Sequence, residues 1–464
     1  MITMEIPWRS PEAGFAPFAG GRPFAALLRT GARAADAGWA ILAHAPRRTL
    51  ELRDGVAFID GESAAGRPFD VARGWLEALA ASAADEIAAE DAALTPPFRR
   101  GLLGFIGYEA AREFEPTLDL PASPYALPDL ALGLYECSAA FHLPTRRAFV
   151  SAPDQSAARR IAASLGTVEP PARLNTDEQA RLCTSTIDGG RYQSMVAEAV
   201  ERIRDGAFYQ ANLAHRPEFD LTARPFDLFR AVASRTDASF PAFLQYKEGI
   251  ILSASPERFF NVRRDEGVLR IAAEPIKGTR PRGWTKEEDA RLATELLNDP
   301  KDRAENVMIA DLMRNDLSRV CADGSVREEH ICRLVSYRTV HHLVSRISGR
   351  LRSGLSALEA MAALFPCGSI TGAPKVAAMR TIGEFEGEGR GPYCGAIGYF
   401  DASGAADFSV AIRTAIIEPG DGSMSAPVGC GVTLRSSPEE EFEESLSKLQ
   451  WLAPSDQKDE RLRP

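Results

Sequence analysis

Short apolar segments separated by turn residues dominate the first third of the chain. Residues 39–43 and 101–108 are examples, and this alternation is typical of antiparallel strands. From Ala152 to Arg173 the composition shifts to Ala, Ser, Pro and Arg, which predicts a helix followed by a surface linker. We therefore expect an antiparallel β-rich region over 1–150 and a helix with a linker over 151–180.

Beyond the linker, helices alternate with pairs of strands. The pattern predicts a helix over 190–205, strands near 208–215 and 242–253, and a further strand in the apolar run 269–273. This hairpin-like spacing does not resemble a regular βαβ alternation. It predicts an α+β fold with antiparallel sheets.

One predicted helix carries a carboxylate at the start of its apolar stripe. In residues 305–316 the apolar positions 308, 309, 312 and 313 follow helical spacing, and Glu305 begins the stripe. Burying a carboxylate on that side costs free energy unless it contacts a cation or a metal. The alternative, given equal weight, is that Glu305 only caps the helix.

A second helix is predicted from its capping residues. Ser437 as N-cap, followed by Pro438 and by Glu440 at the third position, forms a capping box with a proline start. Its core stripe consists of Phe442, Leu446 and Leu449. Glu441 and Glu444 lie on an adjacent face, and two interpretations stay open: a solvated acidic first turn, or oxygen ligands that join Glu305 on one Mg2+ ion.

Lys277 follows the predicted strand 269–273 and precedes Gly278. A glycine at a strand end allows backbone to approach a ligand closely, so a cation is held where a substrate could lie. A neutral lysine at such a position is a candidate nucleophile, whereas most lysines are solvated surface residues.

Three further segments could bind a carboxylate. In residues 365–375 the proline Pro374 comes where a helix should begin, so free N–H groups could face an anion. Residues 391–399 and 407–414 read as adjacent antiparallel strands, and Arg413 in the second offers a bidentate fork. Gly429 and Gly431 permit a close backbone approach. Each feature taken singly also has a purely structural explanation.

Composition excludes several classes of protein. The chain has 464 residues, is 45% hydrophobic and carries a formal charge of −10, which argues against a nucleic-acid partner. It contains neither an apolar run of roughly 20 residues nor a signal-peptide pattern, so we expect no membrane span and a cytoplasmic location. Seven cysteines without metal-type spacing fit free thiols.

Several long segments, in order, resemble one family. They read SPERF (255–259), PIKGTRPRG, ENVMIADLMRND, FPCGSITGAPK, GPYCGAIGYF, DFSVAIRT and EEEFEESLSK. The chain is similar in these to the chorismate-utilising enzymes, which include component I of anthranilate synthase and of aminodeoxychorismate synthase, with isochorismate and salicylate synthases as more distant members. The resemblance implies two orthogonally packed antiparallel sheets flanked by helices, a chorismate-binding catalytic region over 181–454 and a polar tail over 455–464.

The same resemblance implies roles for individual residues. Glu257 would be the general acid and Lys277 the nucleophile that attacks C2 of chorismate, with His342 and Thr371 at other active-site positions. The substrate contacts would be Thr279, Tyr393, Arg413, Gly429, Cys430 and Gly431, and the Mg2+ ligands would be Glu305, Glu441 and Glu444.

The residue at position 277 distinguishes members of the family. Anthranilate synthases typically have alanine there and aminodeoxychorismate synthases have lysine, so the resemblance implies conversion of chorismate and ammonia to 4-amino-4-deoxychorismate through a covalent lysine adduct, for 4-aminobenzoate and folate synthesis. The alternatives are an anthranilate synthase component I and, from another class, a non-catalytic binding scaffold.

The chain also departs from the family in places. It has Cys430 where a glycine is usual and Leu434-Arg435-Ser436 where an acidic turn is usual, and we assign no tryptophan site. No glutaminase nucleophile turn of the Gly-x-Cys-x-Gly type is present, so ammonia is expected from a separate glutamine amidotransferase subunit. The aminodeoxychorismate lyase that acts next is expected to be a separate protein.

Overall fold

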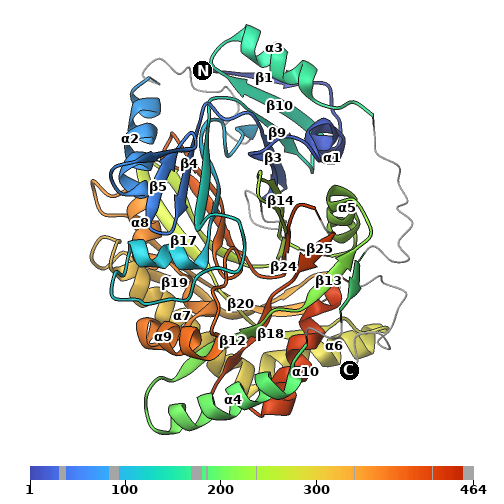
Figure 1. Ribbon diagram of the computed structural model, residues 1–464, viewed down its shortest axis with the longest axis vertical. Helices are drawn as coiled ribbons and strands as arrows, with labels where there is room; N and C mark the ends of the chain where they lie inside the picture. The colour runs from blue at the N-terminus through green and yellow to red at the C-terminus, as the bar shows by residue number, and fades with distance from the viewer. Residues whose placement is uncertain are drawn as a thin grey trace.

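Two large antiparallel sheets form the centre of the computed structural model (Figure 1), which describes residues 1–30, 38–82, 94–168, 180–183, 187–236, 238–338, 340–420 and 422–452. Within these residues the first sheet has 11 strands. Their order is β1 (Ile2–Ile6), β10 (Arg147–Ala152), β9 (Ser138–His142), β3 (Trp39–Ala43), β2 (Ala25–Arg29), β14 (Phe240–Gln245), β15 (Ile250–Ser255), β24 (Thr414–Ile417), β25 (Ser423–Ser425), β13 (Glu218–Leu221) and β11 (Ala180–Leu182).

The second sheet has 12 strands in the same described part of the chain. Their order is β18 (Ile276–Pro281), β20 (Val340–Arg350), β17 (Val268–Glu274), β16 (Arg258–Asp265), β23 (Ala406–Val410), β22 (Ala396–Asp401), β7 (Gly101–Ile106), β8 (Leu130–Tyr135), β4 (Arg48–Arg53), β5 (Val56–Ile59) and β6 (Glu62–Ala64), with β19 (Arg327–Ser336) also paired to β20.

A small third sheet, which the sequence pattern did not predict as a separate unit, lies beside the helices at the lower end of Figure 1. It consists of β21 (Gly372–Ala373), β12 (Gln210–His215) and β26 (Val428–Val432). The helices are α1 (Pro11–Phe15), α2 (Pro68–Ala81), α3 (Gln155–Ser164), α4 (Gly189–Arg204), α5 (Pro225–Arg235), α6 (Lys286–Asn298), α7 (Pro300–Ser318), α8 (Ala357–Leu364), α9 (Lys375–Glu386) and α10 (Pro438–Ser447).

Alternating side chains divide the core into three layers. Apolar residues from the facing sides of both large sheets, such as Ile41 and Phe105, form one cluster between them. The outer side of the first sheet packs with α1, α3, α4, α5 and α10, and the outer side of the second sheet packs with α2, α7 and α8. This α+β arrangement, with helices outside two antiparallel sheets, is the predicted fold class.

Strands from the first and last parts of the chain share both large sheets, and each part forms its own continuous block of neighbouring strands. β2 pairs with β14 in the first sheet, and β7 pairs with β22 in the second. The β-rich region expected over 1–150 therefore shares its sheets with the region over 181–454. Within the expected helix and linker, α3 spans Gln155–Ser164. Residues 169–179 of that linker and the tail over 455–464 lie outside the described residues.

The helix signals in the sequence are confirmed, with one detail corrected. The Ser437 side chain caps α10, and Phe442, Leu446 and Leu449 are buried as predicted. Ser437 Oγ accepts from the backbone N–H of Glu440 and donates to Glu439 at 3.2 Å, but within the described residues the Glu440 side chain does not make the reciprocal contact of a capping box. Helix α7 contains the predicted segment 305–316 and packs against β18, β19 and β20.

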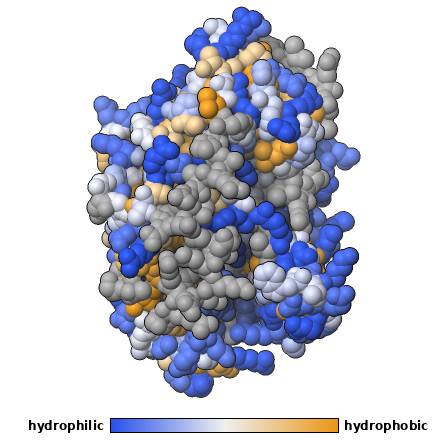
Figure 2. Space-filling model, turned by 90° about the vertical axis from the view of Figure 1, so that its right-hand side faces the viewer, coloured by the Kyte–Doolittle hydropathy of each residue, from blue (hydrophilic) through white to orange (hydrophobic). Residues whose placement is uncertain are grey.

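The described surface is mainly polar. In Figure 2 hydrophobic side chains are scattered between hydrophilic ones where residues are described. Among the helices of the described part of the chain, none combines the length and the apolar character needed to cross a membrane. The seven cysteines are free thiols, as expected.

Candidate active site

Lys277 lies where the second sheet, the third sheet and α7 meet, and the space around its Nζ is called the cleft below. Its side chain is partly buried and its Nζ donates to the carbonyl oxygen of Ser369 at 3.2 Å. A Cβ placed on Gly431 would lie 3.8 Å from this Nζ, so β26 of the third sheet approaches it from another side. These contacts exclude the alternative of a freely solvated surface lysine.

A break in strand register explains how Lys277 is directed. Lys277 pairs with Leu343 of β20 and Thr279 pairs with the next residue, His342, so Gly278 is an extra residue in β18. Gly278 has φ +85°, which a glycine adopts without strain. Asn306 of α7 then donates to the carbonyl oxygens of Lys277 and Leu343, at 3.4 and 2.9 Å, and fixes the two strands together.

Glu257 places a buried carboxyl group beside this lysine. It follows β15, it is 3% exposed, and its Oε1 has no hydrogen-bond partner among the described residues. Burial raises the pKa of Glu257 to about 7, although a hydrogen bond from Ser369 and the charge of Lys277 act in the opposite direction. A carboxyl group that keeps its proton near neutral pH can serve as a general acid.

His342 and Thr279 form a pair on the same side of the cleft. The Nδ1 atom of His342 lies 2.9 Å from Oγ1 of Thr279, and the ring is buried. Burial, and secondly the charge of Arg413, lower the pKa of His342 to about 4, so the imidazole is neutral. Within the described residues its Nε2 makes no hydrogen bond, which leaves one ring nitrogen for a ligand.

Arg413 is a guanidinium group that lacks a protein partner. It follows β23 with φ +48°, and its side chain makes neither a hydrogen bond nor an ion pair within the described part of the chain. Burial lowers the pKa of Arg413 and the charge of Glu257 raises it. An unpaired guanidinium in a cleft is suited to a carboxylate of a ligand.

Two predicted residues lie at the border of this group. Thr371 is fully buried, and its Oγ1 donates to the carbonyl oxygen of Cys367 at 3.1 Å. Tyr393 is buried under the guanidinium of Arg390, which lies 5.9 Å from its ring centre. The contacts of Tyr393 connect it to a neighbouring pocket rather than directly to Lys277.

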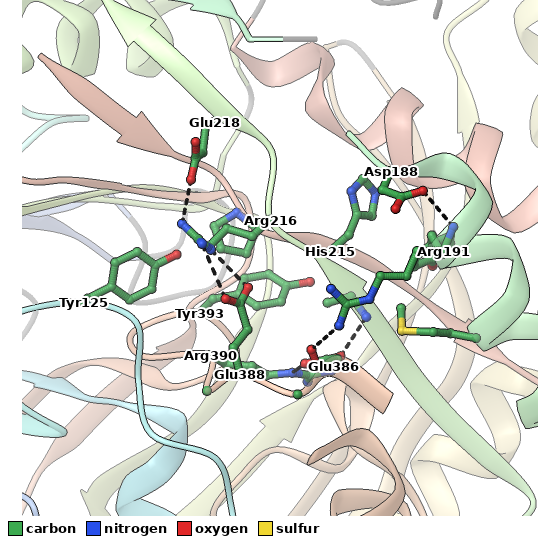
Figure 3. A pocket seen from close by; sticks show the side chains of 16 residues that line it. Tyr125, Asp188, Arg191, His215, Arg216, Glu218, Glu386, Glu388, Arg390 and Tyr393 are labelled. Atoms are coloured by element: carbon green, nitrogen blue, oxygen red, sulfur yellow. Dashed lines mark hydrogen bonds and ion pairs between the residues drawn. The ribbon is translucent and has the colours of Figure 1, made fainter. Parts of the chain in front are cut away.

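That neighbouring pocket has a volume of about 310 Å3 and is lined by charged residues that neutralise one another (Figure 3). Arg216 pairs with Glu388 at 3.0 Å and with Glu218 at 2.9 Å. Arg390 donates to Glu386 at 2.8 Å. Since these charges are paired within the protein, this pocket offers a ligand fewer unpaired charged groups than the cleft around Lys277 does.

Three carboxylates on two helices border the other end of the cleft. Glu305 of α7 makes no hydrogen bond or ion pair among the described residues, and burial raises its pKa while Lys277 lowers it. Glu441 of α10 is buried and accepts from the Ser436 hydroxyl at 2.7 Å. For Glu444, burial would raise the pKa, but the ion pair with Lys448 at 2.8 Å contributes to a net lowering.

The carboxylates of Glu441 and Glu444 lie close enough together to share a hard cation, whereas Glu305 is not part of that close group. Glu305 is partly buried, has no partner among the described residues, and lies close enough to Glu444 for their charges to interact. Glu441 and Glu444 also lie within 4.8 Å of the Cys430 sulfur. The oxygen atoms suit Mg2+, whereas the sulfur donates to the carbonyl oxygen of Glu441 at 3.3 Å and is not needed as a ligand.

Sequence reasoning did not select two residues that line this cleft. Gln210 of β12 is 1% exposed, and its Oε1 has no partner in the described structure. Its Nε2 would lie 2.3 Å from a Cβ on Gly431, so Gln210 and Lys277 both face that glycine. Ser369, the second, contacts Lys277 and Glu257. A polar amide at an inward position of the apolar segment 208–215 was the available signal for Gln210.

The fold and the cleft together define an enzyme-like site for a small anionic ligand: an unpaired guanidinium, a protonated carboxyl, a lysine and a group of carboxylates that can hold a cation. A family model described as chorismate binding enzyme matches residues 32–454. The chain therefore belongs to the chorismate-binding enzyme family.

Individual relatives carry two different names. The chain is 35% identical over 449 residues to anthranilate synthase component 1 of Thermus thermophilus, covering 96% of this chain and 94% of the relative. It is 34% identical over 465 residues to aminodeoxychorismate synthase component 1 of Klebsiella aerogenes, covering 96% and 97%. The crystal structure of anthranilate synthase component I from Streptococcus pneumoniae superposes with a TM-score of 0.77 at 28% identity, covering 90% of this chain and 92% of that one.

Proposed function

We propose that this chain converts chorismate and ammonia to 4-amino-4-deoxychorismate, as an aminodeoxychorismate synthase component I. The observation that carries the proposal is Lys277, whose Nζ lies in the cleft, 3.2 Å from the Ser369 carbonyl oxygen and close to Glu257. The alanine typical of anthranilate-forming relatives cannot act as a nucleophile there.

In the first half-reaction, the neutral amine of Lys277 forms a bond to C2 of chorismate. Both ring double bonds shift, from C1=C2 and C5=C6 to C1=C6 and C4=C5, and the bond from C4 to its hydroxyl breaks. The lysine nitrogen becomes a secondary ammonium. Glu257 donates a proton to the departing oxygen, which leaves as water. The raised pKa of Glu257 supports this role because the proton must still be present near neutral pH.

In the second half-reaction, ammonia forms a bond to C4. Both double bonds shift back, the bond from C2 to Nζ breaks, and Lys277 leaves as a neutral amine. The product carries the added nitrogen as an ammonium group, and Glu257 regains a proton from it or from water. Overall, one chorismate and one ammonia are consumed, and one aminodeoxychorismate and one water are formed.

The two carboxylates of chorismate require two different partners. Arg413, which has no protein partner, is assigned to the enolpyruvyl carboxylate, together with Tyr393, Thr279 and the backbone of Gly429 to Gly431. Glu305, Glu441 and Glu444 are assigned to Mg2+. A bound Mg2+ ion would anchor the ring carboxylate and draw electron density toward it.

Ammonia is proposed to come from a separate glutamine amidotransferase subunit, and removal of pyruvate from the product is assigned to a separate lyase. Both assignments rest on the kinship with aminodeoxychorismate synthases, two of whose component 1 chains are 37% and 36% identical to this chain over 355 residues.

A product assay tests the proposal. The purified chain is incubated with chorismate, ammonium and Mg2+, and the products are separated and identified by mass. We expect aminodeoxychorismate from the wild type and from the control Lys286→Ala, an exposed lysine on the neighbouring α6. Lys277→Ala should lose that product or divert to ammonia addition at C2.

Three outcomes would contradict the proposal. Anthranilate from the wild type would favour the alternative family member. An unchanged product and rate in Lys277→Ala would exclude the lysine as nucleophile. Chorismate binding without turnover would favour a binding scaffold.

A further inference from the structure

Strand register in the second sheet places arginines opposite arginines. Arg263 of β16 pairs with Arg270 of β17, and Arg270 pairs with Arg350 of β20. Directly paired residues of antiparallel strands point to the same face of the sheet, and like charges in that position repel each other. The three side chains therefore form one row on one face of the sheet, across β16, β17 and β20.

The neighbouring strand β19 adds a fourth arginine to this face. Arg327 pairs with Ser348, which lies two residues before Arg350 and so points to the same side of β20. Three of the four arginines, all except Arg263, line a pocket with a volume of about 410 Å3. Its residues are Arg270, Gly324, Ser325, Arg327, Ser348 and Arg350.

Protein carboxylates neutralise these arginines to different degrees. Arg263 is partly buried near Asp407 and Glu274. Asp265 pairs with Arg270 at 2.8 Å, and both side chains are about half exposed. Arg327 and Arg350 make no ion pair or side-chain hydrogen bond within the described residues. Arg216 and Arg390 of the pocket in Figure 3, by contrast, bind protein carboxylates.

The chain as a whole is acidic. It contains 64 acidic and 54 basic residues, yet none of the acidic residues that the structure describes pairs with Arg327 or Arg350. A row of guanidinium groups that repel one another is stabilised when an anion lies between them.

We propose that this pocket is a binding site for a phosphate-class oxyanion, either inorganic or esterified. The guanidinium forks of Arg270, Arg327 and Arg350 can each donate two hydrogen bonds to phosphate oxygens, and the hydroxyl of Ser348 adds a neutral donor. The site is separate from the catalytic cleft, since Arg350 follows His342 by eight residues of β20, or roughly 26 Å at about 3.3 Å per residue. It does not depend on the function proposed above.

Calorimetric titration of the whole chain tests this site. Inorganic phosphate, pyrophosphate and glycerol 3-phosphate are titrated separately, at constant ionic strength and without divalent metal. We expect saturable binding of one anion per chain for at least one of them. The probe that binds most tightly shows whether the ligand is a free phosphate or a phosphate ester.

Arginine variants locate the binding. Arg350→Gln and Arg327→Gln should each weaken it about tenfold or more, which corresponds to one lost charge-assisted contact. Arg159→Gln, an exposed arginine on α3, should leave it unchanged. Binding that does not saturate, that is equal in all three variants, or that disappears in Lys277→Ala would overturn the proposal. Because the three arginines are exposed, circular dichroism should show the same fold in every variant.

Discussion

The buried carboxyl of Glu257 should make the stability of the protein fall as pH rises. Burial raises its pKa from about 4.5 in the unfolded chain to about 7 in the folded one, so folding favours the protonated form. The stability that comes from this proton is complete below pH 4.5 and is lost as pH rises through 7. The loss amounts to about 3 kcal/mol at high pH.

Glu257→Gln retains the shape and a hydrogen-bond donor but cannot ionise. We compare the free energy of unfolding of Glu257→Gln with that of the wild type. The difference, variant minus wild type, should be about 3 kcal/mol larger at pH 8.5 than at pH 4.5. Urea unfolding followed by far-ultraviolet circular dichroism at the two pH values measures this difference. Glu443→Gln, on the exposed face of α10, is the control and should show no pH-dependent difference.

The same variant should lose catalysis. Without a general acid, kcat is expected to fall by roughly 10²- to 10⁴-fold. Parallel stability profiles for wild type and Glu257→Gln would refute the raised pKa, and activity within twofold of wild type would refute the role as acid. Greater stability at high pH together with lower activity is the combination that the structure predicts.

Other substitutions test the remaining parts of the cleft. Glu305→Gln should abolish Mg2+-dependent turnover, and activity that persists in EDTA would show that the metal assignment is wrong. Arg413→Lys should raise KM for chorismate about tenfold with a smaller effect on kcat, because the bidentate contact is lost; a change in kcat alone would contradict this role. Gly429→Ala should destabilise the fold by about 1–3 kcal/mol in urea unfolding, because its Cβ would lie 2.2 Å from a backbone oxygen. Gly431→Ala should remain folded, because the contact at 2.3 Å is with the movable side chain of Gln210, but it should lose activity; equal stability losses in the two glycine variants would contradict this distinction.

Features encoded locally in the sequence were predictable. The start of α10 follows from Ser437 and Pro438, which act on neighbouring N–H groups, and the helical spacing of Phe442 and Leu446 identifies its buried face. In that helix the residues that determine the structure lie within one or two turns of each other. The segment 242–253, expected as one strand, instead contains the turn of the hairpin formed by β14 and β15.

Features that depend on distant pairing were not predictable from local patterns. The third sheet joins β12 to β26, whose residues are more than 200 positions apart, and only this pairing brings Gln210 to Gly431 and Lys277. The resemblance to chorismate-utilising enzymes indicated most of the cleft residues because it carries such distant relations implicitly. It gave no signal for the arginine row, which arises from strand register.

The pairing of an early strand with a late strand in each large sheet also constrains how the chain can be synthesised and folded. β7 pairs with β22 such that Gly101 lies opposite Asp401, so β7 leaves the ribosome about 300 residues before this partner exists. At about 5–20 residues per second the delay is roughly 15 to 60 s, during which apolar strand edges lack their native neighbours. Production of the first 150 residues alone should therefore yield an aggregating fragment, and chaperone binding during translation should be prolonged.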